Sequence, residues 1–330
     1  MKATLTRRHL MLGSAASLVL PGASWAQAGA GWPTRPVKVI VPSGAGGVVD
    51  VLARQLYDRL QKVFGQPFVI DNRPGANGLL GLTAVKNAAP DGYTIVHTSA
   101  SASVMNEALN PDLPVKTLRD LAPVALTATG GVLLAVHSSV PAKTLPELVE
   151  LIRRDPKYQT YGSWGVGSNG HLTMEWIKQK AGLPTFNHVP YKTIPALVTD
   201  IVAGVIPIGW VDLVSPVGFI EQGKLRGIAL NGEVRSPRLP DIKLMSEQGF
   251  AFPATGWQGV FAPKGTPVQI LDRLHAAINK ELNEPELRDA IRKVNVEPPT
   301  VVSRQAFTKL LENDLAVWRQ IVEKGNIKPE

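Results

Sequence analysis

The chain has 330 residues, enough for one large domain or for two lobes that each bury a hydrophobic core. Its formal net charge is +8, and its lysine and arginine residues are scattered rather than clustered, which argues against nucleic acid as a partner. The sequence contains no cysteine, which excludes disulfides, thiolate catalysis and cysteine metal sites.

Residues 1–28 have the pattern of a secretory signal peptide. Basic residues and no acidic residue precede an apolar run at 10–20, and small residues follow it. The run is too short to span a bilayer comfortably, so it predicts a signal rather than an anchor. The adjacent Arg7 and Arg8 also resemble a twin-arginine signal, and an ordinary Sec signal is equally consistent. We therefore expect an exported, soluble protein.

The first regular elements predict a strand, a glycine turn and a helix. Residues 37–41 form a β-branched run typical of a buried parallel strand. Pro42 ends the strand, small residues follow, and a helical pattern begins at Val48. The N–H groups and the dipole of such a helix would face the turn and favour an anion, although a purely structural tight turn is the alternative. Asp50 lies in the first helical turn, where we expect a structural role.

This turn matches neither common phosphate-binding motif. Gly44-Ala45-Gly46 begins the dinucleotide fingerprint, but Val49 stands where the third glycine belongs. No Gly-Lys-Ser/Thr sequence follows, so it is not a P-loop either. We expect no cofactor.

The following segments predict further alternation of helices and strands. A helix begins at Val48 and ends at Gly65, and further segments predict strands at 68–70 and 93–98 and a helix at 79–89. This order is typical of a parallel sheet with right-handed crossovers. Ser99, Ser101 and Ser103 follow the carboxyl end of the last of these strands, which is the edge where open α/β sheets bind ligands.

A second α/β unit follows an apolar stretch at 124–136, which is broken at Gly130-Gly131 and predicts a strand that crosses to a second lobe. A helix with Thr144 as its N-cap comes next. The remaining predicted strands are 158–161, 186–189, 206–211 and 225–230, and the predicted helices are 171–180, 194–202 and 217–222. Residues 257–262 are expected to return to the first lobe, and three helical stretches close the chain.

The second glycine-rich turn, at 162–170, raises the alternative of a serine hydrolase. Ser168 and His171 are close in the sequence. A nucleophile elbow needs glycine two residues before the serine, however, and Val166 occupies that position. We expect instead that Ser168 and Asn169 cap the following helix and offer donors to an anion. The histidines form no pair with metal-ligand spacing, so no metal site is expected.

Several segments together resemble one family. These are 42–50 (PSGAGGVVD), 72–76 (NRPGA), 89–93 (APDGY), 161–163 (YGS) with Gly167-Ser168 and His171-Leu172, 189–192 (VPYK), 223–226 (GKLR), and 235–237 (RSP) with 239–241 (LPD). In order and spacing they are similar to the substrate-binding receptors of tripartite tricarboxylate transporters, the Bug family. The resemblance covers nearly all of the chain after the signal.

The resemblance implies an α/β protein with a type II periplasmic binding protein fold, in which two lobes close on a ligand at a hinge. Lobe 1 would comprise residues 29–128 and 234–330, and lobe 2 residues 129–233. It also implies a periplasmic receptor without enzymatic activity that delivers a small carboxylate to membrane permease subunits. The expected ligand is a di- or tricarboxylate or an aromatic acid, and the expected state is a monomer.

The resemblance also assigns site residues. In the first turn, Ser43, Gly44, Ala45 and Gly46 would bind one carboxylate. In the second turn, Ser163, Gly167, Ser168 and Asn169 would bind the other end of the ligand. Ser99 and Ser101 would border the cleft. Further candidates are Trp164, Val166, Trp210 and Asp212, of which Asp212 is also a plausible structural hydrogen-bond acceptor.

The chain departs from the family pattern near the cleft. Ser43 stands where an aromatic residue is frequent, Trp164 where a small residue is usual, and Thr193 where glycine is common. We hypothesise that Trp164 and Trp210 move aromatic bulk across the cleft; the alternative is that both rings pack within their lobe. A secreted esterase or amidase, and a receptor that presents its ligand to a membrane sensor, remain as alternative functions.

Overall fold

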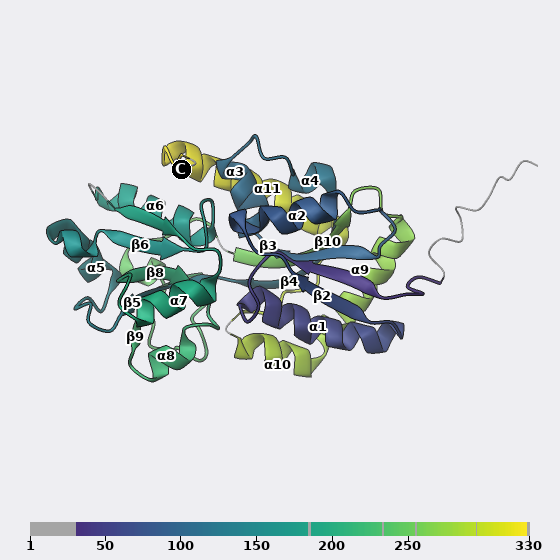
Figure 1. The fold of residues 1–330 in the computed structure, drawn as a ribbon, viewed down its shortest axis with the longest axis horizontal. Helices are drawn as coiled ribbons and strands as arrows, with labels where there is room; N and C mark the ends of the chain where they lie inside the picture. The colour runs from purple at the N-terminus through teal and green to yellow at the C-terminus, as the bar shows by residue number, and fades with distance from the viewer. Residues whose placement is uncertain (1–30, 184–185, 233, 255, 295, 329–330) are drawn as a thin grey trace, which may run out of the picture.

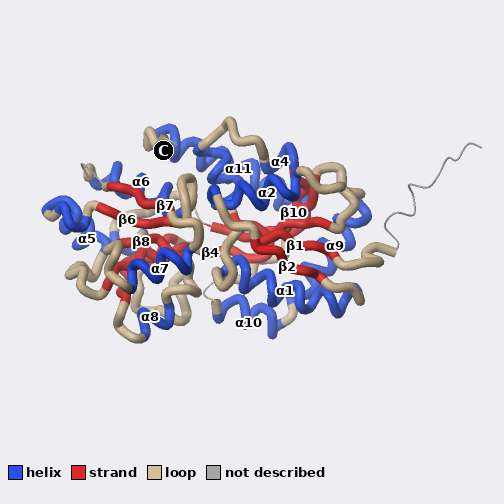
Figure 2. The backbone as a smooth tube through the Cα atoms, viewed as in Figure 1, coloured by secondary structure: helices blue, strands red, loops and turns tan. Residues whose placement is uncertain are grey.

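The computed structural model describes residues 31–183, 186–232, 234–254, 256–294 and 296–328, and the predicted signal peptide lies outside them. Two mixed β-sheets of five strands each lie side by side (Figure 1). Each sheet is covered by helices on both faces, and the tube in Figure 2 shows each red sheet between blue helices. The predicted α/β class with two lobes is therefore confirmed. Within the described residues, no helix is long and apolar enough to cross a membrane.

The sheet of lobe 1 is built around the first predicted strand. In spatial order its strands are β2 (Phe68–Asn72), β1 (Val37–Val41), β3 (Thr94–Ser99), β10 (Gly256–Pro263) and β4 (Leu121–Gly130). β1 pairs in parallel with β2 and β3, whereas β10 runs antiparallel to β3 and β4. The last of the described strands, β10, thus inserts into a sheet that the N-terminal segment begins.

Helices pack on both faces of this sheet and bury two separate cores. One core lies under α1 (Val48–Phe64), α9 (Val268–Asn283) and α10 (Pro285–Lys293). The other lies under α2 (Leu79–Lys86), the single-turn π-helix Ser101–Met105, α3 (Asn106–Leu109) and α11 (Arg304–Lys324), with the short α4 (Thr117–Asp120) at its edge. Apolar stripes on these helices, such as Leu52, Leu56 and Leu60 of α1, face the sheet as predicted.

Lobe 2 repeats the arrangement with its own strands. Their order is β7 (Asn187–Pro190), β6 (Thr160–Ser163), β8 (Ile208–Val211), β5 (Val132–His137) and β9 (Leu225–Asn231). The helices α5 (Leu145–Arg154) and α6 (Asn169–Ala181) cover one face, and α7 (Ile194–Val202) and α8 (Val217–Glu221) cover the other. β5 runs antiparallel to both of its neighbours.

The predicted parallel sheet is therefore wrong in part, and the sheet of lobe 2 is mixed as well. β10 arrives from a distant part of the chain and lies antiparallel between β3 and β4, and β5, the first strand of lobe 2, lies antiparallel between the later strands β8 and β9. Local alternation of strands and helices predicts the parallel units correctly, but it carries no information on where a late strand inserts. The turn at Ser101–Met105 and α3 were also not predicted, because serines there mask a helical pattern.

The lobes are joined at two crossings. The first lies at Gly131, between β4 and β5, three residues beyond the predicted end of lobe 1 at 128. The second precedes β10. Leu239 and Met245 are buried in cores of lobe 2, although they follow the predicted boundary at 234. We therefore propose that lobe 2 extends at least to Met245.

Candidate functional site

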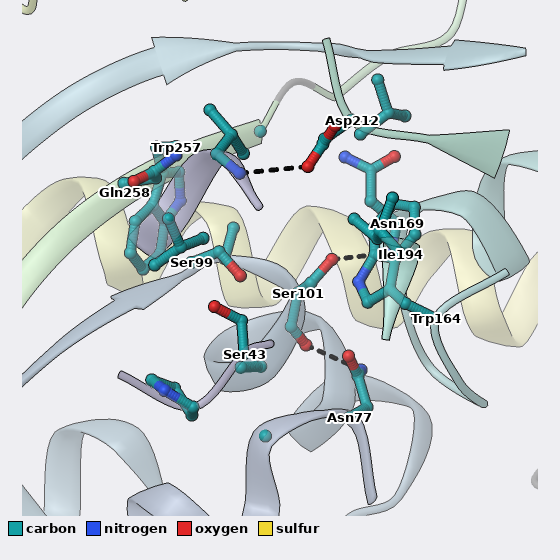
Figure 3. Close-up of a pocket in the computed structure, with 18 of the residues that line it drawn as sticks. Ser43, Asn77, Ser99, Ser101, Trp164, Asn169, Ile194, Asp212, Trp257 and Gln258 are labelled. Carbon is teal, nitrogen blue, oxygen red and sulfur yellow. Dashed lines mark hydrogen bonds between the residues drawn. The ribbon is translucent and has the colours of Figure 1, made fainter. Parts of the chain in front are cut away.

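A pocket lies between the two lobes and takes its walls from both. It encloses about 900 Å³ of space, part of it open to solvent. Lobe 1 contributes the ends of β1, β3, β4 and β10 and the first turn of α1, and lobe 2 contributes Trp164, Asn169, the segment 192–194 and Asp212. Figure 3 shows side chains from both lobes converging on this space. Pockets at a domain interface are typical ligand sites.

The N-terminus of α1 has no side-chain cap at Gly47, as its glycine turn predicts. Carboxylates of the protein itself accept hydrogen bonds from its free N–H groups. The Gly46 N–H donates to Asp50 Oδ2 at 2.9 Å, and the Val48 N–H donates to Asp212 Oδ2 at 3.0 Å. Two of the donors that predicted an anion site at this turn are therefore engaged by carboxylates of the protein.

Asp50 stabilises the first glycine turn through hydrogen bonds, in agreement with the structural role expected for it. Arg54 donates to both of its carboxylate oxygens at 3.0 Å, and Asn72 Nδ2 donates to Oδ1 at 2.9 Å. Asn72 Nδ2 also donates to the Ser43 carbonyl at 3.1 Å. Burial raises the pKa of Asp50, but the hydrogen bonds from Arg54, Gly46 and Asn72 outweigh burial and hold it below its usual value.

Asp212 joins the lobes. It follows β8 of lobe 2, is buried, and its Oδ2 reaches the α1 N-terminus of lobe 1 (Figure 3). Within lobe 2, Oδ1 accepts from the N–H groups of Val214 and Ser215 at 3.0 and 2.7 Å, and Oδ2 accepts from the Ser215 hydroxyl at 3.1 Å. Burial raises the pKa of Asp212 in spite of these donors.

The N-terminus of α6 is the counterpart on lobe 2. Ser168 is its N-cap and accepts from the His171 N–H at 3.2 Å, which confirms the predicted cap. The Asn169 N–H donates across the cleft to Ser101 Oγ of lobe 1 at 2.8 Å. In lobe 1, Asn77 Nδ2 donates to the Ser101 carbonyl at 3.0 Å (Figure 3). Each lobe thus places a side chain on the helix N-terminus of the other.

The departures from the family pattern meet at this pocket. The Trp164 ring lies beside the α6 N-terminus and Ile194, with Asn169 next to it in Figure 3. A methyl group on Gly44 would lie 2.7 Å from Cγ2 of Thr193, so Thr193 packs directly over the first glycine turn. Trp164 and Thr193 therefore make the lobe 2 wall bulkier than a small residue and glycine would.

The pocket also contains polar atoms that are not used elsewhere. Ser43 Oγ and Gln258 Oε1 are buried and have no hydrogen-bond partner among the described residues. The hydroxyl groups of Ser43 and Ser99 point into the same space in Figure 3. These groups are free to bind a ligand.

The structure brings only part of the predicted site to the pocket. The predicted residues that line it are Ser43, Gly44, Ser99, Ser101, Trp164, Asn169 and Asp212. Ala45 and Gly46 are exposed and do not line it. Val166 packs against a lobe 1 core, and a Cβ at Gly167 would lie 3.0 Å from Asn106 of lobe 1. The second glycine turn is thus mostly a packing surface between the lobes.

The prediction that Trp210 lines the pocket is wrong. Its side chain is fully buried in the core of lobe 2 under α5 and α6. A Cβ at Gly170 would lie 2.4 Å from the Trp210 Cβ, so the ring lies beneath α6 rather than in front of it. Alternation along β8 decides this: Trp210 and the neighbouring Val211 face opposite helical layers.

Ser163 and Ser168 are buried beneath the turn and do not line the pocket. Their hydroxyls lie 2.9 Å apart, and Ser163 Oγ lies 2.7 Å from Nε2 of His188. His171 is not placed to act as a base for Ser168, because its Nδ1 already accepts a hydrogen bond from the Gly167 N–H at 3.2 Å. A serine hydrolase needs an accessible nucleophile, which Ser168 does not provide.

Sequence reasoning missed several lining residues. Trp257 and Gln258 lie on β10, and Val296 follows α10. Their distance along the chain from the glycine turns hid them. The insertion of β10 between β3 and β4 brings Trp257 and Gln258 to the pocket, and the pairing of Glu297 with Thr129 of β4 places Val296 there. Lys192 was visible within the VPYK segment but was not assigned to the site. Within the described residues, no group of three or more metal-ligating side chains could hold a metal ion.

Comparison with known proteins identifies the family. Residues 52–327 match the model of the tripartite tricarboxylate transporter family receptor. The chain belongs to this family. The receptor is also 31% identical over 299 residues to Protein BugT of Bordetella pertussis, covering 90% of this chain and 91% of that protein.

Solved structures agree with the family and with the two-lobe fold of periplasmic binding proteins. Rpa4515 of R. palustris with adipate is 29% identical, with a TM-score of 0.84, over 91% of this chain and all of that one. MatC from Rhodopseudomonas palustris with bound malate is 28% identical, with a TM-score of 0.82, over 88% of this chain and all of that one. The receptor is thus a binding protein of the Bug type and not an enzyme.

Proposed function

We propose that this receptor is exported to the periplasm, captures a small carboxylate between its lobes and delivers it to the membrane permease of a tripartite transporter. The observation that carries the proposal is the interlobe pocket, with walls from both lobes and a hydrogen bond in each direction across it. The carboxylates in the Rpa4515 and MatC structures support an acidic ligand.

Lobe closure is the physical basis of capture. Closing the lobes removes water from the pocket, and hydrogen bonds to a charged group are stronger in the resulting low dielectric. The Val48–Asp212 and Asn169–Ser101 hydrogen bonds form only when the lobes meet, so they stabilise the closed state in addition to the ligand. A monomer suffices for this mechanism, since both walls come from one chain.

A thermal-shift screen of the purified receptor tests the ligand class. The panel holds mono-, di- and tricarboxylates, aromatic acids and neutral alcohols of matched size. An acid at about 100 times its dissociation constant is expected to add about 2.7 kcal/mol to the unfolding free energy. Stabilisation by neutral solutes and by none of the acids would contradict the proposal.

Delivery is tested separately. We expect uptake of the identified acid into proteoliposomes that contain the permease only when the receptor is present. Binding without receptor-dependent uptake would instead favour the alternative of a receptor that presents its ligand to a membrane sensor.

A further inference from the structure

The charge of the pocket is nearly balanced, and its buried charge is negative. Lys192 and Asp212 are the charged residues among the described residues that line it. Lys192 is exposed, whereas Asp212 is buried with a relative exposure of 2%. Like charges repel strongly where water is excluded, so a ligand carboxylate near Asp212 would be destabilised. The favourable place for a single carboxylate is at Lys192.

The helix N-termini offer little to a second carboxylate. At α1, Asp50 and Asp212 accept from the Gly46 and Val48 N–H groups. At α6, Ser101 and Ser168 accept from the Asn169 and His171 N–H groups. A second carboxylate that binds these N–H groups would have to displace these side chains, and displacing a buried hydrogen-bonded carboxylate costs free energy.

The space between these charged groups is largely apolar. Trp257, Leu213 and Val296 line it together with Trp164 and Ile194. Ser43 Oγ and Gln258 Oε1 are buried beside it without a partner in the described part of the chain; the hydroxyl of Ser43 can donate or accept, whereas Gln258 Oε1 only accepts and so suits a hydroxyl or N–H donor of the ligand. Such walls stabilise a hydrocarbon body by burial.

We infer that the ligand is a monocarboxylate with an apolar aliphatic or aromatic body, whose carboxylate pairs with Lys192 and whose body lies between Trp164 and Trp257. The inference rests on the proposed function and narrows it. Its ligand class differs from the adipate and malate of the two R. palustris structures, which carry a carboxylate at each end.

The test compares ligands with the same six-carbon chain: hexanoate, adipate and hexan-1-ol, with benzoate and phthalate as an aromatic pair. Isothermal titration measures each affinity. We expect hexanoate and benzoate to bind about ten-fold or more tightly than adipate and phthalate. Tighter binding of the diacids overturns the monocarboxylate class and leaves the proposed function intact. Binding of hexan-1-ol but of no acid overturns both.

Variants of Lys192 and Asp212 test the charges. Lys192→Met is expected to weaken hexanoate binding about ten-fold, Lys192→Arg to retain it, and Lys62→Met at the far end of α1 to leave it unchanged. Equal affinity in Lys192→Met contradicts the assigned ion pair.

For Asp212→Asn the relevant quantity is the ratio of the adipate and hexanoate affinities, because loss of the hydrogen bond to Val48 weakens lobe closure for every ligand alike. We expect the affinity for adipate relative to hexanoate to rise about ten-fold when the buried negative charge is removed. An unchanged ratio shows that Asp212 does not exclude a second carboxylate, and it overturns the inference.

Discussion

Asp50 and Asp212 are both buried carboxylates beside the N-terminus of α1, yet their pKa values are displaced in opposite directions. Asp50 has the Arg54 guanidinium as a partner, which outweighs its burial. Asp212 has only neutral donors, so burial dominates. Residue type and burial alone therefore do not decide in which direction the pKa of a carboxylate is displaced; a nearby cation does.

Trp164 is expected to report ligand binding. Its ring lines the pocket, whereas Trp210 is buried in lobe 2. Ligand titration should change the tryptophan fluorescence of the wild-type receptor and change it much less in Trp164→Phe. Trp257 also lines the pocket and accounts for a residual signal. Identical responses of the two proteins would contradict a position of Trp164 next to the ligand.

His97 is expected to make the receptor acid-sensitive. Its ring is fully buried on β3, Nε2 lies 3.0 Å from Thr127 Oγ1, and burial lowers its pKa to about 3 from the usual 6.5. Between these pH values the unfolded chain binds a proton that the folded chain does not, so the free energy of unfolding falls as pH drops below 6.5.

The slope that one such histidine contributes approaches about 1.4 kcal/mol per pH unit. Urea unfolding at pH 7, 6 and 5 measures it, and His97→Gln should show a shallower slope than wild type. Burial also lowers the pKa of His171 to about 3, so part of the slope remains in the variant. Equal slopes would show that His97 titrates normally in the folded receptor.

At the scale of elements, the strand–turn–helix unit appears once in each lobe, and the two differ in how the helix begins. The N-cap of α1 is a glycine without a side-chain cap, and Asp212 of lobe 2 accepts a hydrogen bond from its first N–H group. By contrast, α6 is capped by its own Ser168. A helix N-terminus leaves free N–H groups that must find acceptors. In this receptor the acceptors come partly from the other lobe, so the same groups that suggest an anion site stabilise closure.

Ser168→Ala tests the cap of α6. We expect a loss of about 1–2 kcal/mol in unfolding free energy, because the His171 N–H loses its acceptor and Ser163 loses a hydroxyl partner. Ser303→Ala is the matched control at the exposed cap of α11, which accepts from the Ala306 N–H, and should cost about 1 kcal/mol. Urea unfolding measures both; a smaller loss for Ser168→Ala than for Ser303→Ala would contradict the buried network.

At the scale of the whole molecule, the chain crosses from lobe 1 to lobe 2 at Gly131, which is a tightly packed position. A Cβ on Gly131 would lie 1.3 Å from the carbonyl oxygen of Asn231, on the neighbouring strand β9. Gly131→Ala must therefore separate β5 from β9 at the point where the chain enters lobe 2. We expect a loss of more than about 3 kcal/mol in unfolding free energy, or failure to fold.

Gly218→Ala is the control for this change. It lies in α8, and a Cβ there would meet no heavy atom within 4 Å. Alanine should stabilise the helix by about 0.5–1 kcal/mol. Denaturant unfolding compares the two variants, and a Gly131→Ala protein as stable as wild type would show that the crossing can relax at low cost.

The sequence by itself determined the local units: β1 and its glycine turn, the stripe of α1, the caps Thr144 and Ser168, and the motif set that identifies the family. These features depend on residues close together in the chain, where side-chain periodicity and capping act directly.

Only the tertiary structure decided which of these residues face the ligand pocket. Strand β10 inserts between β3 and β4 and brings Trp257 and Gln258 to the site, and Asp212 reaches Val48 across 164 positions of sequence. Trp210 was misplaced for the same reason, since the layer that covers each side of β8 is set by distant helices. Contacts between distant segments depend on how whole sheets and lobes pack, and no local pattern encodes that packing.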